Sequence, residues 1–150
     1  LSNAPARADL RIFGDTGTTV ELSGRVVEAS CQEPLIGAKV EIWHASPNGT
    51  YDNASSEMRY RCQLTTDSEG RYNLLTLLPG RYPNGDSYRP RHLHLKVWDS
   101  TGNERLTTQF YFAGDPYIEC DALANQSLVL RYEGSETTQI SITEADLILV

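Results

Sequence analysis

The sequence predicts an all-β fold, a sandwich or a barrel, from three observations. Runs of alternating or β-branched residues recur along the chain, and turn signals rich in Gly, Asn, Asp and Pro separate them. No window offers four turns of the 3.6-residue helical period. At 150 residues, without an internal repeat or a linker, the chain has the size of one domain. We therefore expect a single domain over residues 1–150, with residues 1–18 as a loose N-terminal lead-in.

Four strands are expected in the first half of the chain. Residues 19–29 (TVELSGRVVEA) and 37–43 (GAKVEIW) interleave branched aliphatic residues with polar ones, and the turn signal PNG follows the second run. Residues 59–66 (RYRCQLTT) and 71–77 (RYNLLTL) flank the turn signal DSEG, and LPG ends the fourth run.

Four further strands are expected in the second half. Residues 92–98 (HLHLKVW) and 105–112 (RLTTQFYF) are joined through DSTG, and AGDP ends the second of these runs. Residues 127–132 (SLVLRY) and 137–150 (TTQISITEADLILV) complete the set.

Composition narrows the class of partner. A formal charge of −7 argues against a nucleic-acid-binding surface, which needs clustered Lys and Arg, and favours a small-molecule partner. No apolar run approaches the roughly 20 residues of a membrane span, so we expect a soluble chain. The start, LSNAPARADL, lacks the segments of a signal peptide but resembles a cloning remnant, so a leader could have been removed. This start favours a secreted or periplasmic location with the leader removed over a cytoplasmic one, which stays open as the alternative. The oligomeric state also stays open.

The cysteines form no recognisable framework. Their number is odd and no CxxC spacing occurs, so neither a disulfide scaffold nor a structural zinc site is indicated, although one disulfide plus a free thiol remains an alternative. The three cysteines are Cys31, Cys62 and Cys120. Three glycosylation sequons, at Asn48, Asn53 and Asn125, carry little weight because short polar loops produce such triplets by chance.

The stretch RPRHLHLKVW carries two of the three histidines two positions apart on an expected strand. Side chains at i and i+2 share a face, with Cα atoms about 6.6 Å apart, so His92 and His94 can converge on one object, such as a metal ion. The opposite face carries Leu93, Leu95 and Val97, a core-packing row. Two half-buried histidines with ordinary hydrogen-bond partners are the alternative.

Two imidazoles do not hold a metal alone, so other ligands are needed. The third histidine, His44, shares a face with Val40 and Ile42 and is interpreted as a packed residue at a strand end. Among the eight tyrosines, Tyr51 and Tyr82 stand in turns, SPNGTYDN and LLPGRYPNG, where a side chain is free to reach a site. Half-buried rings with hydrogen-bonded hydroxyls are the alternative for both.

Several motifs, in order, resemble the intradiol ring-cleavage dioxygenases, the family of protocatechuate 3,4-dioxygenase and catechol 1,2-dioxygenase. The resemblance runs from about residue 20 to residue 122, and its strongest part is RPxHxH, preceded by PGxY and followed by LTTQ. It implies a single-domain antiparallel β-sandwich of prealbumin-like type. The pattern G-x-V, GA-x-V and TD-x-x-G-x-Y-x-L of the first half also resembles transthyretin-like and carboxypeptidase-regulatory-like modules, which supply a non-catalytic binding module as the alternative.

The family resemblance implies a mononuclear, non-haem Fe(III) site whose ligands are Tyr51, Tyr82, His92 and His94. Phenolate oxygen is a hard anionic donor, and a trivalent ion can lower the pKa of a tyrosine, which suits this set. The resemblance further implies that Arg89 stabilises charge on the substrate and that Gln109 lies at the site.

The implied activity is an oxidoreductase reaction in which a catechol-type aromatic binds iron, displaces the tyrosinate that matches Tyr82, and is cleaved by O2 between its two hydroxylated carbons. Two departures from the family pattern concern the substrate. Arg91 stands at the x of RPxHxH, where a smaller residue is expected, and the connection to PGxY is trimmed to PNGDSY, so a more open pocket is expected. The given residues include no helical dimerisation segment of the catechol 1,2-dioxygenase type, so we expect the chain to resemble the protocatechuate type or compact relatives more closely.

Overall fold

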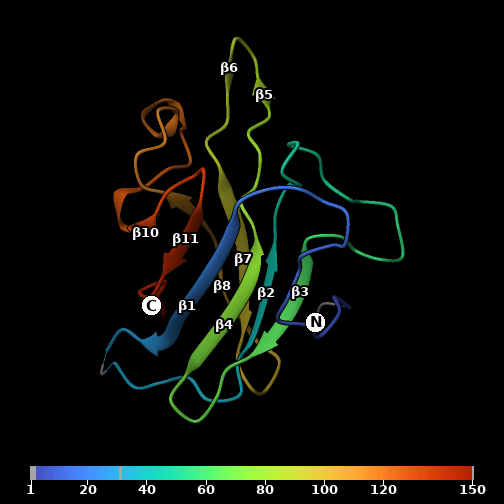
Figure 1. Cartoon of the computed structure of the whole chain (residues 1–150). Coiled ribbons are helices and arrows are strands. Elements are labelled where there is room, and N and C mark those ends of the chain that lie inside the picture. The colour runs from blue at the N-terminus through green and yellow to red at the C-terminus, as the bar shows by residue number, and fades with distance from the viewer. Residues whose placement is uncertain (1–2, 31, 150) are drawn as a thin grey trace.

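Two β-sheets packed face to face make up most of the protein (Figure 1). The computed structural model describes residues 3–30 and 32–149. The first sheet contains β1 (Thr19–Glu28), β4 (Arg71–Leu77), β10 (Glu133–Gly134), β11 (Gln139–Ile142) and β12 (Leu147–Leu149). The second has the order β3 (Arg61–Thr65), β2 (Lys39–Trp43), β7 (His92–Trp98), β8 (Glu104–Phe112) and β9 (Val129–Leu130). The all-β sandwich predicted for this chain is confirmed.

The last two predicted strands are shorter than the sequence indicated. The run 127–132 contributes only β9 to the second sheet, after a short 3₁₀ helix η2 (Gln126–Leu128), because the chain then crosses to β10 in the first sheet. The run 137–150 forms β11 and β12, which pair in parallel with the first and second halves of β1. Both sheets therefore contain parallel as well as antiparallel pairs. The parallel pairs arise because the chain enters β9, β11 and β12 through crossovers rather than hairpins.

A close approach of the backbone separates β11 from β12. The amide of Ala145 donates to the carbonyl of Ser23 at 3.0 Å, and the buried Tyr72 hydroxyl donates to the carbonyl of Ala145 at 2.5 Å. A Cβ atom at Gly24 would lie 2.0 Å from that carbonyl oxygen. Glycine in the middle of β1 thus leaves room for the chain to pass between the two short strands.

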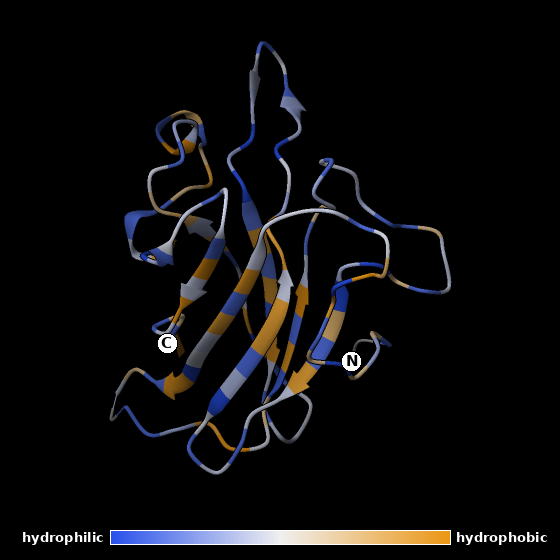
Figure 2. Cartoon of the chain, in the orientation of Figure 1, coloured by the Kyte–Doolittle hydropathy of each residue, from blue (hydrophilic) through white to orange (hydrophobic). Residues whose placement is uncertain are grey.

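The core lies between the sheets and follows the period-two alternation of the strands. Figure 2 shows hydrophobic and hydrophilic residues alternating along β1 and β4. Leu93, Leu95 and Val97 of β7 have no exposed surface, and Val20 and Leu22 of β1 are 0% and 2% exposed. These residues belong to one continuous hydrophobic cluster, in which both sheets take part.

The N-terminal lead-in is not loose, which corrects the expectation for residues 1–18 within the part that is described. The amide of Gln63 in β3 donates to the carbonyl of Pro5 at 2.9 Å, and Leu75 in β4 exchanges backbone hydrogen bonds with Ala8 and Leu10. Leu10 is only 2% exposed. The segment covers strand edges in both sheets, so backbone groups that would face solvent are paired.

A short hairpin and two loops gather at one end of the sandwich (Figure 1). The trimmed segment PNGDSY forms the hairpin of β5 (Pro83–Asn84) and β6 (Ser87–Tyr88), with Gly85 at its turn and a φ of 63°. The connection from β2 to β3 and the connection from β8 to β9, which contains the 3₁₀ helix η1 (Ile118–Cys120), lie at the same end. The predicted site residues are found there.

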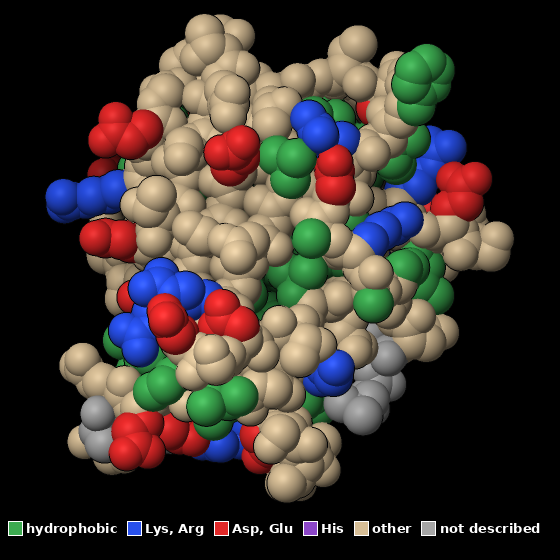
Figure 3. Space-filling view, turned by 60° about the horizontal axis from the view of Figure 1, so that its bottom comes forward, with side chains coloured by type: hydrophobic (Ala, Val, Ile, Leu, Met, Phe, Trp, Pro, Cys, Tyr) green, Lys and Arg blue, Asp and Glu red, His purple; other side chains and the backbone are tan. Residues whose placement is uncertain are grey.

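The surface and the thiols have no unusual organisation in the described part of the chain. On the face shown in Figure 3, acidic and basic side chains are interspersed with small hydrophobic areas. Cys62 is buried and Cys120 exposed, both as free thiols, while Cys31 lies outside the described residues. Within residues 3–30 and 32–149, the structure has no helix with the length and apolar character of a membrane span.

The Gly24 contact predicts a large effect of a single methyl group. Gly24→Ala should lower the free energy of unfolding by about 3 kcal/mol, because the new Cβ meets a backbone carbonyl that cannot move without breaking the β1–β12 register. Urea denaturation of both proteins measures this difference. Glu21→Ala, at an exposed position of the same strand, is the control and should change the stability by less than about 0.5 kcal/mol. Equal stabilities for parent and Gly24→Ala would contradict the crossing geometry.

Candidate metal centre

A row of four side chains crosses the outer face of the second sheet. The strand register places Arg61 beside Trp43, Trp43 beside His94, and His94 beside Gln109. The Trp43 and His94 rings stack at a centroid distance of 4.9 Å with an interplanar angle of 5°, and the Arg61 guanidinium lies 4.9 Å from the Trp43 ring centroid. Packing from β2 therefore fixes the plane of the His94 ring.

The two histidines of β7 share this outer face, as the two-residue spacing predicts. Their ring centroids are 4.9 Å apart. His92 is 3% exposed, whereas His94 is only partly buried. His92 Nδ1 donates to the carbonyl of Pro90 at 2.7 Å, so the proton sits on Nδ1 and the Nε2 lone pair faces the site.

The two tyrosines reach the histidines from loops that are held against each other. Tyr51 follows the PNG turn and Tyr82 follows the LPG turn. The amide of Gly80 donates to the carbonyl of Ser46 at 2.9 Å, and a Cβ at Gly80 would lie 2.4 Å from the carbonyl oxygen of Pro47. A Cβ at Gly49, where φ is 83°, would lie 2.3 Å from the carbonyl oxygen of Arg81. Glycine at both turns permits this backbone contact, which sets the two tyrosines side by side.

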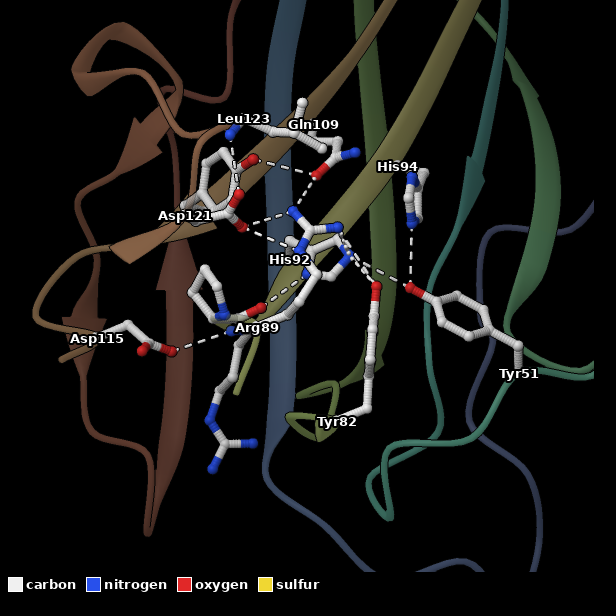
Figure 4. A network of polar contacts seen from close by, with 12 residues as sticks. Tyr51, Tyr82, Arg89, His92, His94, Gln109, Asp115, Asp121 and Leu123 are labelled. Carbon is white, nitrogen blue, oxygen red and sulfur yellow. Dashed lines mark hydrogen bonds and ion pairs between the residues drawn. The ribbon is translucent and has the colours of Figure 1, made fainter. Parts of the chain in front are cut away.

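Four lone-pair-bearing atoms converge at this point (Figure 4). Tyr51 Oη lies 3.2 Å from His92 Nε2 and 3.0 Å from His94 Nε2, and Tyr82 Oη lies 3.3 Å from His92 Nε2. Ligand atoms about 2.0–2.1 Å from one ion are about 2.8–3.4 Å apart at 90° to tetrahedral angles. The spacing and the chemistry of the donors therefore fit a single metal ion.

The composition of the donor set limits which ion fits. Among the described residues, no three His, Cys, Asp or Glu side chains are grouped to hold a metal, so a complete set here requires the phenol oxygens. Hard phenolate donors with two imidazoles suit a hard, highly charged cation, whereas zinc sites use thiolate or further imidazole.

Burial keeps the two imidazoles and the Tyr51 phenol of the site neutral in the metal-free protein. Burial lowers the pKa of His94 to about 4, and the charges of His92 and Arg89 act in the same direction. Burial also lowers the pKa of His92. The pKa of Tyr51 is raised above its usual range by burial and by its hydrogen bond with Tyr82. The Nε2 atoms of both histidines are thus available as neutral ligands.

Arg89 lies at the edge of this cluster and touches it with one nitrogen. Its Nη1 donates to Tyr82 Oη at 3.3 Å and to His92 Nε2 at 3.4 Å, while Nη2 donates to Gln109 Oε1 at 3.0 Å. Gln109 Oε1 also accepts from the Tyr111 hydroxyl at 3.1 Å, so both bonds fix the direction of the amide. The resulting arrangement places a cation and an oriented amide beside the four donors.

The predicted site residues assemble as a group. The structure brings together Tyr51, Tyr82, Arg89, His92, His94 and Gln109. His44 is not among them: it is 1% exposed, its Nδ1 contacts the carbonyl of Ala45 at 2.6 Å, and its Nε2 contacts Thr76 Oγ1 at 2.8 Å. His44 is a packed residue at the end of β2.

Other residues of the site were missed by the sequence interpretation. Trp43 occupies the register position next to His94, and Asp121 binds Arg89. Asp115 accepts from the amide of Arg91 at 3.0 Å and from Arg81 Nε at 3.1 Å, and so fixes the chain just before β7. Asp115 lies in the AGDP turn, and an Asp before Pro in a turn could have been recognised from the sequence as a candidate hydrogen-bond acceptor. Asp121 lies in a connection that contains no motif, so nothing in the sequence pointed to it.

A polar pocket of about 570 Å³ lies beside Tyr51, on the β2–β3 connection. Hydroxyl and carboxyl groups dominate its lining, which includes Asp15, Ser46, Thr50, Asp52, Ser55 and Glu57. Arg81 and Arg91 lie outside this lining and pair with Asp115 and Glu136 instead.

Comparisons with known proteins agree on one family. A family model described as "Dioxygenase" matches residues 3–149. The chain is 34% identical over 120 residues to the protocatechuate 3,4-dioxygenase beta chain of Burkholderia cepacia, covering 71% of this chain and 50% of that protein. It is 36% identical over 124 residues to catechol 1,2-dioxygenase of Acinetobacter baylyi, covering 70% of this chain and 39% of that protein. The chain therefore spans half or less of the length of these relatives.

Solved structures extend the similarity to the whole described fold. The dioxygenase domain of a dioxygenase carbohydrate-binding protein fusion from Streptomyces sp. SirexAA-E matches with a TM-score of 0.84 and 31% identity, over 98% of this chain and 89% of that chain. Catechol 1,2-dioxygenase from Pseudomonas arvilla C-1 matches with a TM-score of 0.81 and 28% identity, over 99% of this chain and 58% of that chain.

The buried histidines predict an acid sensitivity of the metal-free protein. His44 and His94 have folded-state pKa values lowered to about 4, below the value of about 6.5 in an unfolded chain. Between these values the unfolded chain binds protons that the folded protein does not, so the free energy of unfolding should fall as the pH falls from about 6.5 towards 4. Urea denaturation across this range and NMR titration of the imidazole resonances measure both effects. Histidine resonances that all titrate near pH 6.5 would contradict the described burial.

Proposed function

Because the chain belongs to the intradiol dioxygenase family, we propose that it is an Fe(III)-dependent domain that cleaves the ring of a catechol-type aromatic with O2, between the two hydroxylated carbons. The convergence of Tyr51, Tyr82, His92 and His94 on one point carries this proposal. A scaffold that only binds or tethers has no use for two phenols and two neutral imidazoles joined by three contacts of 3.0–3.3 Å.

The four donors are proposed to hold a mononuclear, non-haem ferric ion. The imidazoles are already neutral and, in His92, oriented by the Pro90 carbonyl, whereas the phenols must lose their protons. A trivalent cation next to both oxygens favours that loss, because the attraction between opposite charges exceeds the cost of burial. When bound, the ferric ion supplies the Lewis acidity and electron transfer that make a catechol reactive towards O2.

Tyr82 is proposed to exchange a proton with the substrate. A catechol that binds through both oxygens must lose two protons, so bases are needed within the site. Tyr82 Oη is the phenol oxygen that Arg89 also contacts, at 3.3 Å, and it lies on a loop beside the β5–β6 hairpin. We assign the deprotonated Tyr82 Oη as the acceptor of one catechol proton, and a hydroxide ion from solvent takes the second. Tyr51, which faces both histidines, stays in place as a ligand.

Arg89 and Gln109 are proposed to stabilise the negative charge that develops on the substrate. A guanidinium never loses its proton in a protein, so it provides a fixed positive charge at the edge of the site. The oxygen of Gln109 is occupied by Arg89 and Tyr111, which turns its NH2 group away from them and towards the side of His94 (Figure 4). Two donors are thus preorganised next to the four ligand atoms.

Iron loading and turnover test the proposal directly. The protein should bind one Fe(III) per chain, show a visible red-brown charge-transfer absorption from tyrosinate, and shift this absorption when a catechol is added without O2. With O2, a muconate-type diacid should appear, detected by mass spectrometry across a panel of catechols. Iron binding without visible colour would refute tyrosinate ligation, and a coloured protein that cleaves none of the catechols would favour the non-catalytic module.

The two tyrosines should differ when each is changed to phenylalanine. Tyr51→Phe removes a ligand that stays in place throughout and should lose most of the iron and all activity. Tyr82→Phe should keep at least part of the iron with altered colour, and its spectrum with a catechol, recorded without O2, should approach that of the parent complex. Its turnover should fall by about 100-fold or more, because a proton acceptor is lost.

Tyr88→Phe provides the matched control for both variants. Tyr88 is 47% exposed on β6 and packs against Tyr117 at a ring-centroid distance of 5.7 Å. It should keep the iron, the colour and the activity of the parent. Equal spectra for Tyr82→Phe and the parent before a catechol is added would exclude Tyr82 as a ligand.

A further inference from the structure

We infer that Asp121 is a positioning residue that aims the Arg89 guanidinium at the candidate site. The inference rests on the proposed function for its catalytic consequence, but the placement itself rests on contacts in the β8–β9 connection. Asp121 lies directly after η1, outside every motif of the sequence.

The contact between the two side chains is short and buried. Asp121 Oδ2 accepts from Arg89 Nη2 at 2.5 Å and from Arg89 Nε at 3.0 Å. The side chains of Arg89 and Asp121 are 12% and 6% exposed. A buried guanidinium without a carboxylate partner is strongly unfavourable, so this pairing decides where the Arg89 side chain can rest.

The carboxylate is itself held by its own turn. Asp121 Oδ1 accepts from the amide of Leu123 at 2.9 Å (Figure 4). The amide of Asp121 donates to the carbonyl of Ile118 at 3.1 Å. Asp121 therefore presents Oδ2 to Arg89 from a fixed backbone rather than from a free side chain.

The pairing leaves one guanidinium nitrogen for the site. Nε and Nη2 are engaged by Asp121, and Nη2 also by Gln109, so Nη1 is the nitrogen that faces Tyr82 Oη and His92 Nε2. A long arginine side chain has many rotamers, and the two hydrogen bonds from Nε and Nη2 to Asp121 favour the rotamer in which Nη1 points at the four donors. Loss of the Asp121 carboxylate should allow Arg89 to adopt other rotamers while leaving every ligand atom in place.

A purely structural role is the rival explanation, because the same ion pair also ties the β8–β9 connection to the base of the hairpin. The two explanations differ in a double-mutant cycle. If Asp121 acts through Arg89, then Asp121→Asn has no further effect on turnover once Arg89 is alanine. If Asp121 only stabilises the connection, the two effects are independent and multiply.

The first measurement uses the metal-free protein and therefore does not depend on the proposed function. In the parent, the Arg89 Nε–H resonance should be observable by NMR and exchange slowly with solvent, because its hydrogen bond is buried. Asp121→Asn should accelerate this exchange by about tenfold or more. Asp121→Glu, which keeps the charge but places it on a longer side chain, should give protection between that of Asp121→Asn and that of the parent. Asp86→Asn, which removes an exposed charge from the hairpin tip, should leave the protection of the parent unchanged. Equal exchange in parent and Asp121→Asn would overturn the inference.

The second measurement uses the iron-loaded protein. Asp121→Asn should keep the iron content and the visible absorption of the parent, lower kcat about 10- to 100-fold, and change KM by less than about threefold. Arg89→Ala should lower kcat by at least as much, and the double variant should equal Arg89→Ala. Multiplying effects, or a loss of iron in Asp121→Asn, would overturn the positioning role.

The outcomes separate this inference from the proposed function. A parent protein that neither binds iron nor cleaves a catechol refutes the function, and the exchange of Arg89 Nε–H still decides whether Asp121 positions the guanidinium. If Asp121→Asn unfolds, Asp121→Glu carries both measurements, with intermediate protection and intermediate kcat as the expected result and parent-like values for both as the contrary one.

Discussion

The alternation of side chains along β7 is the constraint on which the rest of the structure depends. Leu93, Leu95 and Val97 have no exposed surface and hold the strand in the core, so His92 and His94 necessarily point to the opposite face. A slip of one residue would exchange the two faces and place imidazoles in the hydrophobic cluster. β2 and β8 pair with β7 on either side and fix this register, so the packing of the core determines where the site lies.

Side chains from the neighbouring strands and from two loops surround the histidines on the outer face of the second sheet. Register neighbours on β2 and β8 supply Trp43, which stacks on His94, and Gln109, which binds Arg89. The tyrosines come from loops instead, and those loops are fixed against each other by backbone contacts at Gly49 and Gly80 that a Cβ atom would block. The strand β7 thus orients the two imidazoles, and the turns at Gly49 and Gly80 place the two phenols next to them.

The protonation states of the metal-free site are compatible with the cation proposed for it. Burial keeps both imidazoles neutral and raises the pKa of Tyr51, while Asp121 balances the charge of Arg89. Two neutral imidazoles and the Tyr51 phenol therefore lie together, a donor set that suits the cation proposed for this site. The ion pair of Arg89 and Asp121 lies next to these side chains, and it orients the Arg89 guanidinium so that Nη1 faces Tyr82 and His92.

The sequence by itself determined β1 to β4, β7 and β8, the division of β7 into a core face and a site face, and the set of residues that the family resemblance implies, because these follow from local periodicity and from motifs. Only the tertiary structure decided the rest. The approach of Tyr51 to Tyr82, the stacking of Trp43, the hold of Asp121 on Arg89 and the docking of the N-terminal segment all join parts of the chain far apart in sequence. The division of residues 137–150 into β11 and β12 also depends on the passage of Ala145 over Gly24. Periodicity specifies which face a side chain occupies, but partners across strands and loops are chosen by the packing of the whole chain.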